Sequence, residues 1–170
     1  MNIILILLQS LDGYIAKDEN DDLSWGTKED KQFFRDKTKE IGTMVMGRKT
    51  FESMPPKAFS NRHSIVLTRD PVQYKGYINN HGTVEFFSGA PEDLVENLEG
   101  RDIKTVALIG GGGVNTAFLE AGLVTELYIT IAPVILGSGI KGLGGDQNTY
   151  FNLVETWQLS TNEVVLHYSI

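Results

Sequence analysis

The chain has 170 residues, of which 41% are hydrophobic and 22% charged, a composition typical of one globular domain over residues 1–170. Its 22 acidic against 15 basic side chains give a net charge of −7, which argues against a nucleic-acid partner or an anionic membrane surface. The absence of cysteine excludes disulfides, a thiol nucleophile and cysteine-ligated metals, and the three histidines lack ligand spacing, so we expect no metal site.

The first predicted element is a strand over the apolar run Ile3–Leu8. This run is too short for a signal peptide or a membrane helix, and no basic region precedes it. We therefore expect a cytoplasmic protein without membrane contact. The sequence leaves open whether the protein is a monomer or a homodimer.

Strand and helix patterns alternate along the rest of the chain. An acidic loop over residues 17–24 is followed by a helix over 28–40, which begins with a T-x-x-D capping pattern. The next predicted elements are a strand at 43–46, a short helix at 50–53, strands at 64–68 and 84–87, a helix at 91–98, a strand at 105–109, a helix at 114–121, a long strand at 127–136 interrupted by Pro133, and a hairpin of strands at 156–160 and 164–170. This order predicts an α/β domain with a mostly parallel sheet and an antiparallel edge at the C-terminal hairpin.

Two candidate ligand-binding segments follow predicted strands, where ligands of parallel sheets bind. Met46–Thr50 opens a helix, whose free N–H groups attract phosphate, and it adds two basic side chains. The residues alone leave open whether this is a phosphate site or a tight turn with solvated cations.

The second segment is Gly110–Gly113, which follows a predicted buried strand and opens a helix. It does not match G-x-G-x-x-G, because Asn115 stands at the sixth position, and it lacks a Walker lysine. An ordinary Rossmann site and a P-loop are therefore disfavoured. Glycines allow close backbone approach, so a ligand contact is favoured over a flexible turn.

Asp30 has two possible roles. At the third helical position it can cap the helix start reciprocally with Thr27, and the residues alone favour this role. Alternatively, its carboxylate faces an apolar cleft that Phe34, one turn away, would share. Trp25, five residues earlier, belongs either to the core or to the wall of the same cleft.

Six motifs together indicate a family. They are Ser10–Ala16, Trp25 with Asp30 and Phe34, Met46–Ser53, Arg62 before Ile65–Leu67, Ile109–Gly112, and Leu127–Thr130. In this order and spacing the chain resembles the dihydrofolate reductase superfamily along almost its whole length, including the reductase domain of riboflavin biosynthesis. The resemblance implies a three-layer α/β fold with helices on both faces of the sheet.

The resemblance also implies NADPH as the cofactor. The residues it assigns to cofactor binding are Leu8, Ile15, Gly47, Arg48, Lys49, Thr50, Thr68, Arg69, Ile109, Gly110, Gly111, Gly112, Gly113 and Val114. Of these, Gly47–Thr50 would hold phosphates, and Thr68 and Arg69 would lie near the adenosine 2′-phosphate. A cis peptide at Gly110–Gly111 is implied beside the cofactor.

For the substrate, the resemblance implies dihydrofolate, reduced at C6 and protonated at N5. Asp30 takes the place of the carboxylate that binds the pterin ring, with Trp25 as the second catalytic candidate. The residues assigned to substrate binding are Ile6, Asp30, Phe34, Met54, Arg62 and Thr130. Arg62 takes the place of the arginine that grips the glutamate tail, and the loop at 18–24 is a candidate lid.

Two alternatives remain open. Leu11–Ala16 and Ala132–Gly137 look more like the riboflavin-pathway reductases, which act on a ribosylamino-pyrimidine phosphate, whereas the substrate-facing positions look like dihydrofolate reductase. We weight the latter because substrate choice depends on the site. A non-catalytic binding protein is disfavoured, since Asp30 and both basic segments are present.

Overall fold

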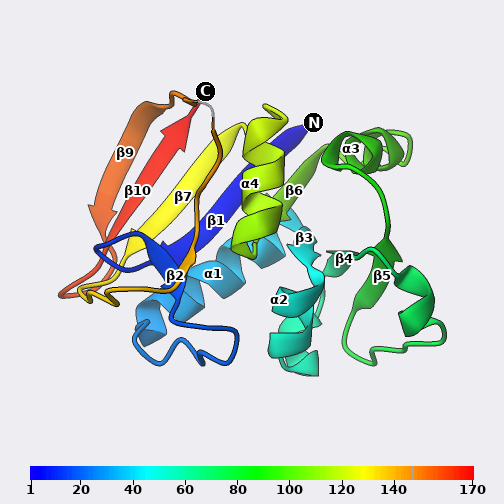
Figure 1. Cartoon of the computed structure of the whole chain (residues 1–170), viewed down its shortest axis with the longest axis horizontal. Coiled ribbons are helices and arrows are strands. Elements are labelled where there is room, and N and C mark those ends of the chain that lie inside the picture. Colours follow the sequence, from blue (N-terminus) through cyan, green and yellow to red (C-terminus); the bar gives the residue numbers. More distant parts are fainter. Residues whose placement is uncertain (147) are drawn as a thin grey trace.

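The computed structural model describes residues 1–146 and 148–170, which form a mixed α/β fold (Figure 1). The strands are β1 (Asn2–Gln9), β2 (Tyr14–Ala16), β3 (Thr43–Gly47), β4 (His63–Leu67), β5 (Thr83–Phe87), β6 (Thr105–Leu108), β7 (Glu126–Ile131), β8 (Ile140–Lys141), β9 (Asn152–Gln158) and β10 (Val164–Ser169). The helices are α1 (Lys28–Ile41), α2 (Arg48–Ser53), α3 (Pro91–Glu99) and α4 (Gly112–Glu120), with short 3₁₀ helices at Pro56–Phe59 and Pro71–Tyr74.

Eight strands form the central sheet, in the order β5-β4-β3-β6-β1-β7-β10-β9. Pairing is parallel from β5 through to β7, and β10 is antiparallel to both of its neighbours. The predicted mostly parallel sheet and its antiparallel C-terminal hairpin are therefore confirmed. In the part of the chain described, no helix is long and apolar enough to cross a membrane.

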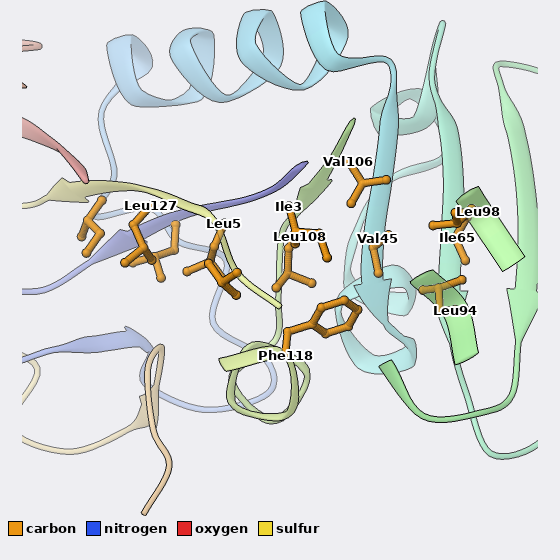
Figure 2. Close-up of a cluster of buried hydrophobic side chains, with 13 residues drawn as sticks. Ile3, Leu5, Val45, Ile65, Leu94, Leu98, Val106, Leu108, Phe118 and Leu127 are labelled. Atoms are coloured by element: carbon orange, nitrogen blue, oxygen red, sulfur yellow. The ribbon is translucent and has the colours of Figure 1, made fainter. Parts of the chain in front are cut away.

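Both faces of the sheet are covered, so its central strands are apolar on both sides. Alternate residues of β1 point to opposite faces: Ile3 and Leu5 face α3 and α4, whereas Ile4 and Ile6 face α1. Figure 2 shows the first cluster, in which Phe118 of α4 and Leu94 of α3 point toward the strands. The resulting three layers fix where the carboxyl ends of the parallel strands lie, and therefore where the site is expected.

Several predicted boundaries differ from the structure. The short helix expected at 50–53 begins at Arg48, and the strand expected at 156–160 spans Asn152–Gln158. The helix expected from Val114 begins two residues earlier, because Val114 N–H and Asn115 N–H both donate to Gly111 O, which makes Gly111 the N-cap. The strand expected to reach residue 136 ends at Ile131, because Pro133 has no N–H with which to continue the ladder.

Beyond Pro133 the chain turns toward the end of β1, where Leu11 N–H donates to Val134 O at 2.8 Å. A second, two-stranded sheet of β2 and β8 lies beside this connection and was not predicted, since its strands have three and two residues. It covers the start of α4: a Cβ on Gly112 would lie 2.1 Å from Lys141 O.

Candidate active site

Asp30 lies at the third position of α1, buried to 7% exposure beside the carboxyl end of β1. The loop before the helix packs against that strand end so closely that a Cβ on Gly26 would lie 2.5 Å from Leu8 Cδ2 and 3.8 Å from Asp30 Oδ2. Thr130, near the end of the neighbouring strand β7, is 1% exposed and faces the carboxylate. The structure thus brings Asp30, Leu8 and Thr130 to one place.

Asp30 does not form the reciprocal cap that the T-x-x-D pattern favours. The Thr27 hydroxyl accepts Asp30 N–H at 3.1 Å, which is one half of a capping box. The other half is supplied from the far end of the chain, because Thr27 N–H donates to Glu163 Oε1 at 3.2 Å and the Thr27 hydroxyl donates to Glu163 Oε2. The Asp30 carboxylate is therefore left available for another partner.

Burial raises the pKa of Asp30, while the Thr130 hydroxyl opposes this shift. The nearby negative charge of Glu163 raises the pKa further, and Lys31 acts in the lowering direction. A carboxyl with a raised pKa in a buried position is characteristic of groups that bind or exchange protons with a ligand.

Arg62 is also buried, at 5% exposure, in the loop that precedes β4. Its Nη1 donates to the Thr38 hydroxyl of α1 at 2.6 Å, and that hydroxyl in turn donates to Phe34 O at 2.7 Å. Its Nε has no partner, and among the described residues no carboxylate lies within ion-pair distance of it. Arg62 is therefore not a solvated loop side chain.

Burial lowers the pKa of Arg62, and the neighbouring positive charge of Arg35 adds to this effect. An arginine nevertheless remains protonated in proteins. Arg62 is therefore a fixed, buried cation without a counter-ion, a suitable partner for an anionic group of a ligand.

The other apolar substrate-side candidates belong to one hydrophobic cluster on the α1 face of the sheet. Ile6 is buried, and Phe34 and Met54 are partly buried against the same cluster on the α1 face of the sheet. Trp25 is half-buried, and its indole N–H donates to Asp21 Oδ2 at 3.2 Å. It is therefore anchored to the acidic loop.

The two glycine-containing segments meet at the carboxyl edge. Gly47 N–H donates to Gly110 O at 2.7 Å, and a Cβ on Gly47 would lie 2.9 Å from Val114 Cγ2. The Gly110–Gly111 peptide is cis, which confirms that expectation, and Gly110 has a φ of +104° that favours glycine. The segment thus forms a close backbone contact between β3, β6 and α4.

The basic residues near these glycines are paired with carboxylates of the chain itself. Arg48 Nη1 lies 2.8 Å from Glu52 Oε2, and Tyr74 donates to the same carboxylate. Lys49 pairs with Glu19, which belongs to the acidic loop before α1. Hydrogen bonding and the charge of Glu52 raise the pKa of Arg48.

The remaining cofactor candidates lie in or directly after strands, or in the first turns of α2 and α4. Thr68 and Arg69 directly follow β4, and Arg69 is exposed. Thr50 of α2 lies close to Gly111, since a Cβ on that glycine would lie 3.3 Å from Thr50 Oγ1. Two further cofactor candidates are half-buried: Ile15 in β2 and Ile109 directly after β6. Gly112 and Gly113 lie in the first turn of α4.

Comparison with known proteins places this geometry in a family. The RibD C-terminal domain family matches residues 1–165. The chain belongs to this family.

Relatives and solved structures agree with this membership. Dihydrofolate reductase of Mycobacterium tuberculosis is 30% identical over 134 residues, which cover 77% of this chain and 80% of the relative. The Bacillus subtilis protein YwjB is 27% identical over 144 residues, 81% of this chain and 79% of the relative.

Two solved structures represent the two branches. Dihydrofolate reductase of Enterococcus faecalis, solved with NADP(H), superposes with a TM-score of 0.71 at 24% identity and covers 99% of this chain and 95% of its own. The bifunctional deaminase/5-amino-6-(5-phosphoribosylamino)uracil reductase of Thermotoga maritima has a TM-score of 0.82 at 19% identity over 99% of this chain and 56% of its own. These likenesses establish the dihydrofolate reductase-like fold, and family membership supports an oxidoreductase.

Several residues of the candidate site were not predicted from the sequence. Glu163 and Thr38 lie in segments whose local pattern shows only a turn and a helix interior. The carboxylate of Asp12 accepts the N–H groups of Leu136 and Gly137 at 3.1 and 2.7 Å. It thereby connects Leu11–Ala16 with Ala132–Gly137, the two segments that resemble the riboflavin-pathway reductases. The local sequence carries no signal for the contacts of Glu163 and Thr38, because their partners Thr27 and Arg62 lie 136 and 24 residues away.

Proposed function

We propose that the protein is an NADPH-dependent reductase that converts dihydrofolate to tetrahydrofolate. The observation that carries the proposal is the Asp30 carboxylate, buried at the carboxyl edge of the sheet with its helix-capping contact taken over by Glu163. A carboxylate held in this way can accept two parallel hydrogen bonds from the amidine-like edge of a pterin.

The residues present fit the cofactor. Gly110 and Gly111 leave backbone without Cβ atoms between β3 and α4, and the starts of α2 and α4 direct N–H groups toward the same edge. Arg48, Lys49 and Arg69 supply positive charge there. When bound, NADPH supplies the hydride that reduces C6 of the substrate.

The chain's own residues orient and charge the substrate. Asp30 would hold the pterin ring by its amino and ring N–H groups, and its negative charge would favour a protonated ring. In this binding mode Asp30 would lie at the edge of the pterin that is opposite to N5. The proton would therefore reach N5 through water. Arg62 would bind the α-carboxylate of the glutamate tail, with Thr38 fixing its orientation.

A second candidate is a ribosylamino-pyrimidine phosphate of the riboflavin pathway. It is favoured by the match to the RibD C-terminal domain and by the Asp12 contacts that join the two riboflavin-like segments. A phosphate could use the same unpaired Arg62 guanidinium. Asp30 favours the pterin, since its carboxylate complements two adjacent N–H donors.

The deciding experiment follows NADPH oxidation by absorbance with each substrate in turn. We expect turnover with dihydrofolate that exceeds turnover with the 5-amino-6-ribosylamino-uracil phosphate. The reverse order would assign the chain to the riboflavin branch, and absence of turnover with both would reject the proposed reductase activity.

A further inference from the structure

Glu163 is a buried carboxylate to which the proposed reaction assigns no role. It lies in the turn between β9 and β10, is 2% exposed, and is 136 residues from its main partner, Thr27. Both of its oxygens face the start of α1, where they accept the N–H and the hydroxyl of Thr27, and the Ser160 hydroxyl adds a contact at 3.3 Å.

A second helix of the same chain shows the ordinary arrangement. In α3 the third helical residue is also an aspartate, Asp93, and its Oδ2 accepts the N–H of the N-cap residue Ala90 at 2.9 Å. In α1 the N-cap residue is Thr27, whose N–H donates to Glu163. The aspartate at the third helical position is Asp30. The two helices therefore differ in which acid satisfies the N-cap N–H group.

We propose that Glu163 is a positioning residue, which occupies the capping contact of α1 and thereby keeps the Asp30 carboxylate directed toward Thr130 and the substrate. The Thr27 hydroxyl gives its only hydrogen to Glu163, so its lone pairs face the Asp30 N–H. This fixes the first turn of α1 without any contribution from the Asp30 side chain. The role in turnover rests on the proposed function of Asp30, whereas the positioning itself does not.

Charge is the second consequence of this arrangement. The groups that act on Asp30 are the Thr130 hydroxyl from β7, the Glu163 carboxylate from the β9–β10 turn, and Lys31 from its own helix. Only Glu163 carries a like charge, so it contributes to keeping the pKa of Asp30 above its ordinary value. Removing that charge while keeping the shape should lower the pKa of Asp30.

Two variants separate the roles of shape and charge. In Glu163→Gln the amide oxygen can still accept Thr27 N–H, while the amide NH2 donates to the Thr27 hydroxyl instead of accepting from it. The N-cap N–H therefore keeps its partner, so we expect Asp30 to stay in place while the like charge beside it is removed. In Glu163→Ala the N–H is released, and Asp30 is expected to rotate and cap it, as Asp93 does in α3. Asp93→Ala is the matched control, since it removes a cap of the same type from an exposed helix start on the other face of the sheet.

The first measurement is a pH titration of the Asp30 carboxyl in the full chain by NMR with carbon-13-labelled aspartate. We expect the pKa of Asp30 to fall in Glu163→Gln, because the like charge of Glu163 is removed, and to stay unchanged in Asp93→Ala. The pH profile of kcat/KM for dihydrofolate should shift to lower pH by the same amount, a change that a purely structural role would not produce.

The second measurement is the crystal structure and kinetics of Glu163→Ala. We expect Asp30 to contact Thr27 N–H and kcat/KM to fall by about tenfold or more, which is about 1.4 kcal/mol. An unchanged pKa of Asp30 in Glu163→Gln would overturn the proposal, as would an unmoved Asp30 in a folded Glu163→Ala. If the wild type reduces neither substrate, the proposed function fails, while the titration still decides whether Glu163 positions Asp30.

Discussion

The charged groups on the two sides of the proposed site are held in opposite ways. On the substrate side, Asp30 and Arg62 are 7% and 5% exposed and have no oppositely charged partner at ion-pair distance among the described residues. On the cofactor side, the Arg48 and Lys49 side chains are 40% and 65% exposed, and both are paired with carboxylates of the chain.

This difference predicts how each side responds to mutation. A buried charge without a counter-ion costs stability in the free protein, and a ligand of opposite charge recovers that cost on binding. An exposed ion pair contributes little, about 0–1 kcal/mol, and can exchange its carboxylate for a phosphate with little loss. We therefore expect large, geometry-dependent effects on the substrate side and small, salt-dependent effects on the cofactor side.

The largest effect is expected for Asp30→Asn. The variant keeps the size of the side chain and the Thr27 contacts of the backbone, but it cannot favour a protonated pterin. We expect kcat/KM for dihydrofolate to fall by about 100-fold or more, measured by NADPH oxidation. Near-normal turnover would remove Asp30 from the reaction, and Asp93→Asn serves as the control at an exposed helix start.

The same variant should lose the contribution of Asp30 to the pH dependence of stability. Because the pKa of Asp30 is raised in the folded protein, the native state binds more protons than the unfolded state above the ordinary aspartate pKa of about 3.9. The contribution of Asp30 to the free energy of unfolding should therefore fall as the pH rises from there through the raised pKa. Asp30→Asn should flatten this slope in urea titrations at several pH values, and an unaltered slope would contradict the raised pKa.

The second effect is expected for Arg62→Lys. Lysine keeps the charge but cannot form the planar pair with a carboxylate while also donating to Thr38. We expect KM for dihydrofolate to rise by about tenfold or more, with NADPH binding unchanged. Arg101→Lys is the matched control, because Arg101 follows α3 on the other face of the sheet and pairs with Glu85.

A pteridine without the glutamate tail distinguishes binding from packing. If Arg62 binds the tail, Arg62→Lys leaves the kinetics of this substrate unaltered. If dihydrofolate kinetics are also unaltered, the folate assignment is wrong, and the ribosylamino-pyrimidine phosphate becomes the better candidate.

The buried and exposed sides also differ in how far the sequence could predict them. The order of strands and helices follows from local apolar periodicity, so β1, α1, β3 and the C-terminal hairpin were predicted within a few residues. The glycines at 110 and 111 and the basic residues of α2 could be selected because they directly follow apolar strands. The contact between Gly47 N–H and Gly110 O follows from the parallel pairing of β3 and β6, whose carboxyl ends lie side by side.

The polar contacts of the substrate side could not be predicted, because they join residues that are far apart in sequence. Thr27 and Asp30 have the spacing of a complete capping box, and only the fold brings Glu163 to the same N–H group. Arg62 stands in a polar loop, which favours a solvated side chain, yet α1 covers it and supplies Thr38. Local spacing reports which contacts a residue can make, and the packing of the layers decides which of them it makes.

On the cofactor side, the first prediction concerns the choice between NADPH and NADH. The exposed Arg69, with Arg48, is expected to contact the additional 2′-phosphate, and one charge-assisted hydrogen bond is worth about 1.5–3 kcal/mol. We expect the wild type to bind NADPH about tenfold or more tightly than NADH, and Arg69→Ala to reduce this ratio about tenfold, measured by fluorescence titration. Arg101→Ala is the control, because Arg101 pairs with Glu85 away from the site, and equal affinities of the wild type for both cofactors would contradict the assignment.

The smallest effect is expected for Glu19→Gln, which breaks the pair between the acidic loop and Lys49. If Lys49 exchanges this carboxylate for a cofactor phosphate, removing the competitor should lower the Kd for NADPH by about two- to fivefold, the range expected for an exposed ion pair. The gain should disappear at about 1 M salt, where charges are screened within about 3 Å. Glu96→Gln in α3 controls for the change in net charge. An unchanged Kd at low salt would mean that Lys49 keeps its carboxylate when the cofactor binds, and the contrast between a fixed substrate side and an exchangeable cofactor side would then be limited to Arg48.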